Sequence, residues 1–105
     1  MMAKNMNNML KQAQQMQVKL AALQKELETR EMETSSGGGM IKIKVNGKQE
    51  LLAININPEC IDPKDSEMLE ELVLTAVNQA IKESQDMVQS AMDKVTGGIN
   101  IPGLF

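Results

Sequence analysis

Lysines near the start of the chain are the residues whose type and spacing could do chemistry. Four lysines and no acidic residue lie between residues 1 and 25, in a protein of formal net charge −3. Lys4, Lys11 and Lys25 are separated by multiples of seven residues, so a helix would carry them along one side, with Lys19 on its flank. Such a row of ammonium groups could neutralise a polyanion. The alternative is that these lysines only solvate an exposed face.

Most residue types that perform catalysis or bind transition metals are missing. The sequence has no His, Tyr or Trp and a single Cys, which removes most of the usual nucleophiles, bases and zinc ligands. Cys60 has no partner in its own chain, and we expect a buried, inert thiol in a reducing compartment. The acidic residues after position 62 suit a helix N-terminus better than a metal site. We therefore predict a protein that is not an enzyme and has no metal, cofactor or small-molecule substrate.

The charge is distributed unevenly along the chain. Residues 1–50 contain eight Lys and Arg against five Asp and Glu, whereas residues 51–105 contain three against nine. A pI of about 4.9 is ordinarily evidence against nucleic-acid binding, because a basic footprint is expected of such a protein. Any contact with a polyanion must therefore be local to the first part of the chain.

Length and the polar N-terminal sequence limit the class of protein. A chain of 105 residues is expected to form one domain, spanning 1–105, with a modest core. The first residues lack the apolar run of a secretory signal, and no stretch reaches the length of a membrane span. We expect a cytoplasmic protein with no membrane partner.

The first long element is predicted to be a helix over residues 5–28. Apolar side chains recur there at spacings of three and four, which is the pattern of a helix with one apolar seam. The seam consists of Met6, Met9, Ala13, Met16, Leu20, Leu23 and Leu27. The helix therefore has an apolar side and, opposite it, a basic side.

Three strands are predicted to follow, over residues 29–35, 40–45 and 51–57. The second and third alternate apolar and polar residues, with Leu52, Ile54 and Ile56 facing inward on the third. Ser35–Gly39 reads as a turn; a phosphate-binding loop is the weaker alternative, because these glycines join two strands. Asn46-Gly47 is a strong hairpin signal. The outer face should pair Lys42 and Lys44 with Glu31 and Glu33, which makes those lysines weaker candidates for binding.

A second helix is predicted over residues 63–95, with Asp62 as its N-cap and Pro63 in its first turn. Its apolar stripe is at first wide enough to lie on the sheet. After Ser84 the stripe narrows, so this half should pack against another helix. An apolar tail over residues 99–105 is expected to dock somewhere, because it holds four large apolar side chains.

The predicted helices are too long for a compact domain of this size. They would measure roughly 38 and 48 Å, against a width of about 34 Å for a compact chain of this length. Part of each helix must project, and its apolar stripe needs a cover. The edges of a small sheet are also open to a further strand. A symmetric homodimer with projecting helical arms satisfies both needs.

Several short motifs together resemble the YbaB/EbfC family of bacterial nucleoid-associated proteins, over nearly the whole chain. The resemblance is carried by Asn46-Gly47-Lys48, by the prolines of the connector, by residues 67–80 and by Thr96-Gly97-Gly98-Ile99-Asn100-Ile101-Pro102-Gly103-Leu104. It implies an α-β-β-β-α subunit of the α+β class, a tweezers-shaped homodimer, and binding of duplex DNA by helical arms. Carried over by position, the contacting residues would be Lys4, Lys11, Gln12, Gln15, Lys19, Lys25, Lys82 and Lys94. The family has no catalytic motif to transfer.

We therefore expect a nucleoid-associated homodimer that binds duplex DNA, mostly through phosphates and with low sequence specificity. A role in gene expression or chromosome organisation would follow. The alternative is a protein-interaction module that uses the Met-rich seam and the apolar tail, without direct DNA contact.

Overall fold

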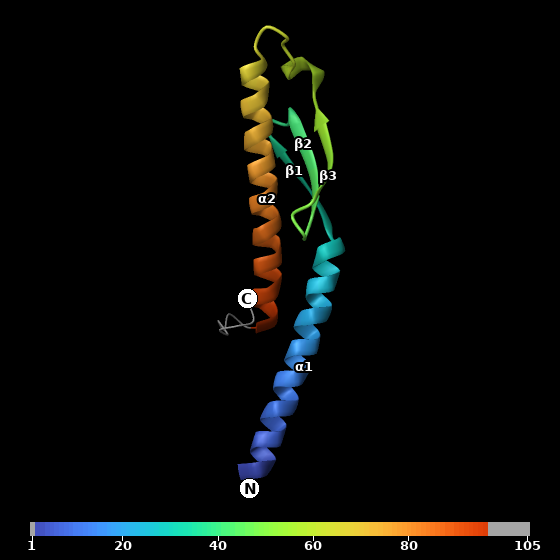
Figure 1. Cartoon of the computed structure of the whole chain (residues 1–105), viewed down its shortest axis with the longest axis vertical. Coiled ribbons are helices and arrows are strands. Elements are labelled where there is room, and N and C mark those ends of the chain that lie inside the picture. The colour runs from blue at the N-terminus through green and yellow to red at the C-terminus, as the bar shows by residue number, and fades with distance from the viewer. Residues whose placement is uncertain (1, 97–105) are drawn as a thin grey trace.

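A computed structural model describes residues 2–96 of the protein, and the side chains of residues 5–95. A long helix, α1 (Met2–Thr29), is followed by three strands, β1 (Glu31–Ser36), β2 (Ile41–Asn46) and β3 (Leu51–Ile56). A short 3-10 helix, η1 (Pro58–Cys60), leads to the second long helix, α2 (Ser66–Thr96) (Figure 1). This order confirms the predicted α-β-β-β-α architecture. The predicted apolar tail lies outside the described residues.

The three strands form an antiparallel sheet in the order β1-β2-β3. Side chains alternate along β2, so that Ile41, Ile43 and Val45 are fully buried while the two lysines between them are exposed. The first half of α2 covers this apolar face with Ala76 and Ala80. Their small side chains let the helix approach the sheet closely, which makes this the main core of the subunit.

Ile54 of the third strand has the predicted facing, but the described elements do not bury it. Ile54 lies opposite Ile43, so both side chains belong to the inner face. Ile54 is nevertheless 46% exposed and Leu52 is 47% exposed. The reason is geometric: a helix is about 10 Å wide and strands are about 4.8 Å apart, so α2 spans β1 and β2 only. An apolar strip of β3 therefore remains open.

The second helix begins later than predicted. Residues 63 and 64 form a turn, in which the Asp62 carboxylate accepts a hydrogen bond from the backbone N–H of Lys64 at 2.9 Å. The helix begins at Ser66, and Asp65 caps it by accepting from the N–H of Met68 at 3.2 Å. The prediction of Asp62 as the N-cap was wrong, because that carboxylate is used by the preceding turn.

The connector holds the single cysteine. The Asn57 side chain caps η1 by accepting from the N–H of Glu59 at 2.9 Å. The buried Cys60 donates its thiol hydrogen to the backbone oxygen of Asn57 at 3.0 Å. The thiol is therefore buried, as expected, and its hydrogen bond stays within the connector.

Beyond Ser84, α2 packs against α1, as the narrowing of its stripe predicted. The second core joins Leu20 and Leu27 of α1 to Met92 of α2. The two helices run in opposite directions, and α2 ends beside the middle of α1 (Figure 1). The molecule measures 77 × 20 × 17 Å and its radius of gyration is 20.2 Å, against about 13 Å for a compact chain of this length. The prediction of a projecting helix is confirmed.

Candidate nucleic-acid interface

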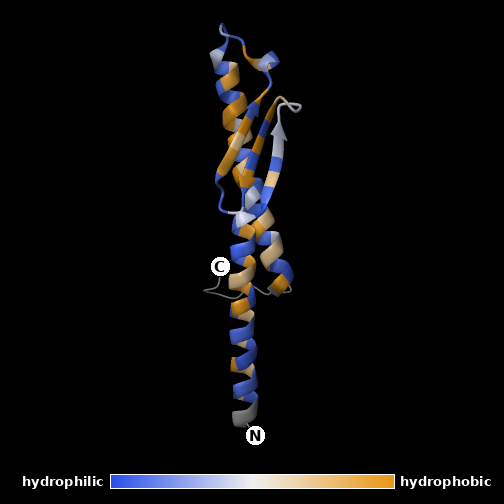
Figure 2. Ribbon diagram, turned by 90° about the vertical axis from the view of Figure 1, so that its right-hand side faces the viewer, coloured by the Kyte–Doolittle hydropathy of each residue, from blue (hydrophilic) through white to orange (hydrophobic). Residues whose placement is uncertain are grey.

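The part of α1 that extends past the end of α2, residues 2–15, is called the arm here. Every side chain from residue 5 to residue 15 is exposed. Figure 2 shows hydrophilic and hydrophobic residues interleaved along this segment. No Gly or Pro interrupts α1, so the arm continues the helix that is anchored by Leu20 and Leu27.

The side of α1 opposite the seam is called the basic face. It includes five of the predicted DNA-contacting residues, all of them exposed: Lys11, Gln12, Gln15, Lys19 and Lys25. Lys4 belongs to the helical backbone of the arm, but its side chain lies outside the described residues. The predicted residues of the first helix therefore lie on one continuous α-helix.

No described side chain neutralises the described lysines of the basic face. Within residues 5–95, the ion pairs are Arg30 with Glu26 at 2.6 Å and Lys48 with Glu28 at 3.9 Å. The lysines of the basic face have no carboxylate partner in this described part. Their ammonium groups are held in solvent and can meet an external anion without breaking an internal contact.

Three of the predicted residues lie around one shallow hollow on the outside of α1. Lys11, Gln15 and Lys19 line it, together with Gln14 and Val18. Val18, which is 69% exposed, occupies the position where the seven-residue spacing would have placed another lysine. The hollow thus has an apolar floor between two cationic groups, and the amides of Gln14 and Gln15 add hydrogen-bond donors.

The two lysines predicted on α2 differ in their positions. Lys94 lines a hollow together with Leu23 of α1 and with Arg30, which follows the last residue of α1, so the fold brings it beside the first helix. Lys82 is exposed, but it lies twelve residues earlier on α2, about 18 Å along the helix axis. Lys94 is therefore the better supported candidate. Arg30, which we had not predicted, is already held by Glu26.

The direction of α1 is set where it meets the β2–β3 hairpin and α2. A Cβ added to Gly47 would lie 1.9 Å from the backbone oxygen of Leu27, so only glycine permits this approach. The buried hydroxyl of Ser84 donates to the backbone oxygen of Asn46 at 2.6 Å. The positive φ of this hairpin, 64°, is found at Gln49 rather than at Gly47. The Asn-Gly signal predicted the hairpin, but glycine is needed for the contact with α1.

The predicted charge ladder on the outer face of the sheet is only half present. Lys44 lies opposite Glu33, but Lys42 lies opposite Ser35 and Asn55, and Glu31 lies opposite Asn46. Ser36 and Ile41 form the last pair before the β1–β2 turn. Counting residues back from this turn would have given the register from the sequence. The prediction that an acid faces Lys42 was wrong.

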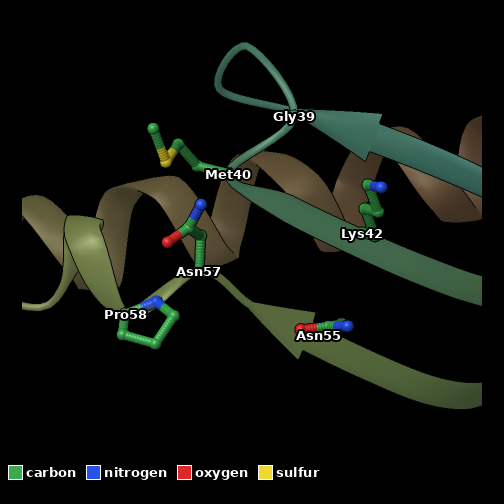
Figure 3. Close-up of a pocket in the computed structure, with 6 residues that line it drawn as sticks. All are labelled: Gly39, Met40, Lys42, Asn55, Asn57 and Pro58. Atoms are coloured by element: carbon green, nitrogen blue, oxygen red, sulfur yellow. The ribbon is translucent and has the colours of Figure 1, made fainter.

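Lys42 instead lines a polar hollow at the end of the sheet (Figure 3). The hollow has a volume of about 300 Å³ and is lined by Gly39, Met40, Lys42, Asn55, Asn57 and Pro58. No acidic residue is among these. It lies beside the β1–β2 turn and the start of η1, at the opposite end of the sheet from α1, so it cannot form one surface with the arm.

The part of the chain that the structure describes has neither a metal site nor a membrane-spanning helix. No group of three His, Cys, Asp or Glu side chains there could hold a metal ion. Neither of the two long helices is apolar enough along its length to cross a membrane. The exposed basic face of α1 is therefore the chemical feature on which a functional account can be built.

The chain is similar to a known protein family and to several named relatives. The YbaB/EbfC DNA-binding family matches residues 2–99. The nucleoid-associated protein TTE0040 of Caldanaerobacter subterraneus subsp. tengcongensis is 56% identical over 101 residues, which cover 96% of this chain and 91% of that protein. A nucleoid-associated protein of Desulforamulus reducens is 54% identical over the full length of both chains.

A solved structure has the same fold. The crystal structure of the uncharacterized protein HP0035 from Helicobacter pylori superposes with a TM-score of 0.68 at 20% identity, over 85% of this chain and 94% of that one. At this identity the likeness concerns the fold alone. The match to the family over residues 2–99, together with relatives more than half identical, shows that this chain belongs to the YbaB/EbfC DNA-binding family.

Proposed function

We propose that this protein is a nucleoid-associated homodimer that binds duplex DNA through the basic faces of its two α1 helices. The observation that carries the proposal is the location of unpaired positive charge. In an acidic protein, Lys11, Lys19 and Lys25 are exposed on one helix that contains no Asp or Glu before Glu26. Because the chain belongs to a DNA-binding family, DNA is the polyanion that we expect this surface to bind.

Binding would come chiefly from phosphate contacts. Each lysine ammonium is a flexible point charge that neutralises a phosphate and releases a condensed counterion. The amides of Gln12 and Gln15 can hydrogen-bond phosphate or sugar oxygens, which sets register without reading the bases. The result is binding with low sequence specificity and a strong dependence on salt.

A second subunit would cover the open apolar strip of β3. The side chain of Gln79 lies over β1, donating to the backbone oxygen of Ser35 at 3.4 Å, so the opposite flank of α2 is on the β3 side. Val73, Leu74 and Val77 line a hollow on that flank, and Leu74 is 62% exposed. We infer that they form, together with the exposed Leu52 and Ile54, an apolar trough of a kind that monomeric proteins rarely expose. A two-fold contact would pair this trough with its copy.

The dimer would double the basic surface. With six to eight phosphates neutralised by two arms, the logarithm of the association constant should fall with the logarithm of salt concentration at a slope of about −5 to −7. Such binding weakens strongly near physiological salt, so it suits a protein that coats or rearranges chromosomal DNA. The relatives are named nucleoid-associated proteins, and we assign this chain the same location, with effects on chromosome organisation or gene expression.

The proposal is tested by a salt titration of binding to a fluorescent duplex. Changing Lys11, Lys19 and Lys25 together to Gln removes six contacts from a dimer, and the slope should become shallower by about 5. The matched control changes Lys42, Lys44 and Lys64 to Gln, which alters the net charge equally at exposed positions off α1.

The control variant should keep nearly the full slope of the unmodified protein. An unchanged slope in the α1 variant, with the dimer intact, would refute the arm model. A shallower slope in the control variant alone would indicate that the DNA binds to the outer face of the sheet. Unaltered binding by both variants would leave the protein-interaction module as the better account.

A further inference from the structure

The apolar seam of α1 continues past the point where α2 can cover it. Met16 and Leu20 pack against the C-terminal part of α2. Met6 is 63% exposed and Met9 is 67% exposed, although both belong to the same seam. Leu10, 60% exposed, widens the uncovered strip. These apolar side chains of the arm are therefore not covered by any residue between 5 and 95.

The course of α2 directs the rest of the chain toward this strip. The two helices are antiparallel, and α2 ends at Thr96 beside the middle of α1 (Figure 1). Val95 still belongs to the core that contains Met16. A chain that continued in the direction of α2 would therefore run along the arm toward its N-terminal end.

The remaining residues have the length and composition that this strip requires. Residues 97–105 number nine and include Ile99, Ile101, Leu104 and Phe105. From Met16 to Met6 the arm measures about 15 Å, and an extended chain covers that distance in about five residues. The segment can therefore reach every exposed position of the seam.

We propose that residues 99–105 dock along the apolar seam of the arm in the same chain, from Ala13 toward Met6. The flexible methionine side chains can adapt to the branched and aromatic groups of the segment. The docked segment lies opposite the basic face, so it shields the seam without covering Lys11 or Lys19. This inference does not depend on DNA binding, and it gives the arm a second layer of apolar packing.

Disulfide trapping tests the proposal in the full-length protein. In a Cys60→Ser background, Met9→Cys is combined with Ile101→Cys and exposed to mild oxidation. The matched control combines Lys11→Cys, at nearly the same height but on the basic face, with the same Ile101→Cys. Peptide mass spectrometry and non-reducing gels then report which pair forms and whether the bond lies within one chain.

The Met9 pair should become mostly disulfide-bonded within one chain while the Lys11 pair stays mostly reduced. Equal trapping of both pairs, or none of the Met9 pair, would overturn the proposal, because the segment would then have no preference for the seam. Disulfides formed chiefly between two chains would overturn the same-chain assignment, because the segment would then dock on the seam of a second copy.

The single aromatic ring of the protein provides an independent readout without new cysteines. Phe105 is the only Phe, and there is no Tyr or Trp. Docking predicts that the Met6 or Met9 methyl resonances are displaced by the ring and return toward ordinary values in Phe105→Leu. Met68, on the first turn of α2, serves as the control and should not move. If the methyl resonances of Met6 and Met9 are the same in Phe105→Leu as in the unmodified protein, the proposal that the segment docks as far as Phe105 is contradicted.

Discussion

Gly47 shows at the scale of one residue how the hairpin determines the direction of α1. Its Cα faces the backbone of Leu27 so closely that a Cβ would lie 1.9 Å from the carbonyl oxygen. The clash would involve backbone rather than the end of a flexible side chain, so it can be relieved only by moving α1. Lys48, paired with Glu28 at 3.9 Å, is a second link between hairpin and helix.

We predict that Gly47→Ala lowers the free energy of unfolding by about 1–3 kcal/mol, as overpacking at a fixed contact does, and weakens DNA binding by reorienting α1. Urea denaturation and duplex binding measure the two effects. Gln49→Gly in the same loop is the control. It relieves the positive φ of 64°, so it should change stability by less than about 1 kcal/mol. Equal losses in both variants would show that the loop, not the contact with Leu27, is responsible.

The candidate site was predictable at this scale only in part. Periodicity placed Lys11, Lys19 and Lys25 on one exposed side of a helix, because local spacing alone decides that. The neighbour of Lys42 depends on strand register, and counting back from the β1–β2 turn would have placed Ser35 opposite it. The role of Gly47 depends on a tertiary contact, about which local sequence carries no information.

The two halves of α2 are divided between two packing partners. Its first half covers the sheet through Ala76 and Ala80, and its second half packs on α1 through Met92. Ser84 lies between the two halves, with its hydroxyl bonded to Asn46. The sequence predicted this division because the apolar stripe narrows there. It did not predict the first residue of the helix, because two aspartates compete for the cap.

The observed start of α2 predicts different costs for those two aspartates. Asp65→Ala removes the side chain that accepts from the Met68 N–H and should cost about 1 kcal/mol in the free energy of unfolding. Asp62→Ala removes only a turn contact to Lys64 and should cost less. Thermal unfolding followed by circular dichroism compares them. A larger loss for Asp62→Ala would place the functional cap at the earlier, predicted position.

The whole molecule is an elongated subunit with an open apolar trough beside β3. One helix cannot cover three strands, so the burial of Leu52 and Ile54 depends on what lies outside residues 2–96. Alternation predicted that Ile54 faces the inner side of the sheet, whereas Leu52 lies at the irregularity that puts Leu51 opposite Val45. It could not predict whether they are covered, because that depends on the position of α2 over the sheet.

If the proposed homodimer forms through this trough, Ile54→Asp should convert it into monomers, because a carboxylate would be buried without a partner in the two-fold contact. In the single subunit this side chain is 46% exposed, so the fold should persist. Ala53→Asp is the matched control, since Ala53 lies on the opposite face across from Lys44. Light scattering should report about half the mass for the first variant and an unchanged mass for the second. A dimer in both would exclude the trough as the interface.

DNA bound by two such subunits would contact α1 and leave the remaining lysines in solvent. Differential lysine acetylation of the unmodified protein, with and without duplex DNA, measures this directly by mass spectrometry. We predict that DNA protects Lys11, Lys19 and Lys25, whereas Lys42, Lys44 and Lys64 react equally in both samples. Equal reactivity of the α1 lysines with and without DNA, under conditions where the complex is formed, would contradict the account.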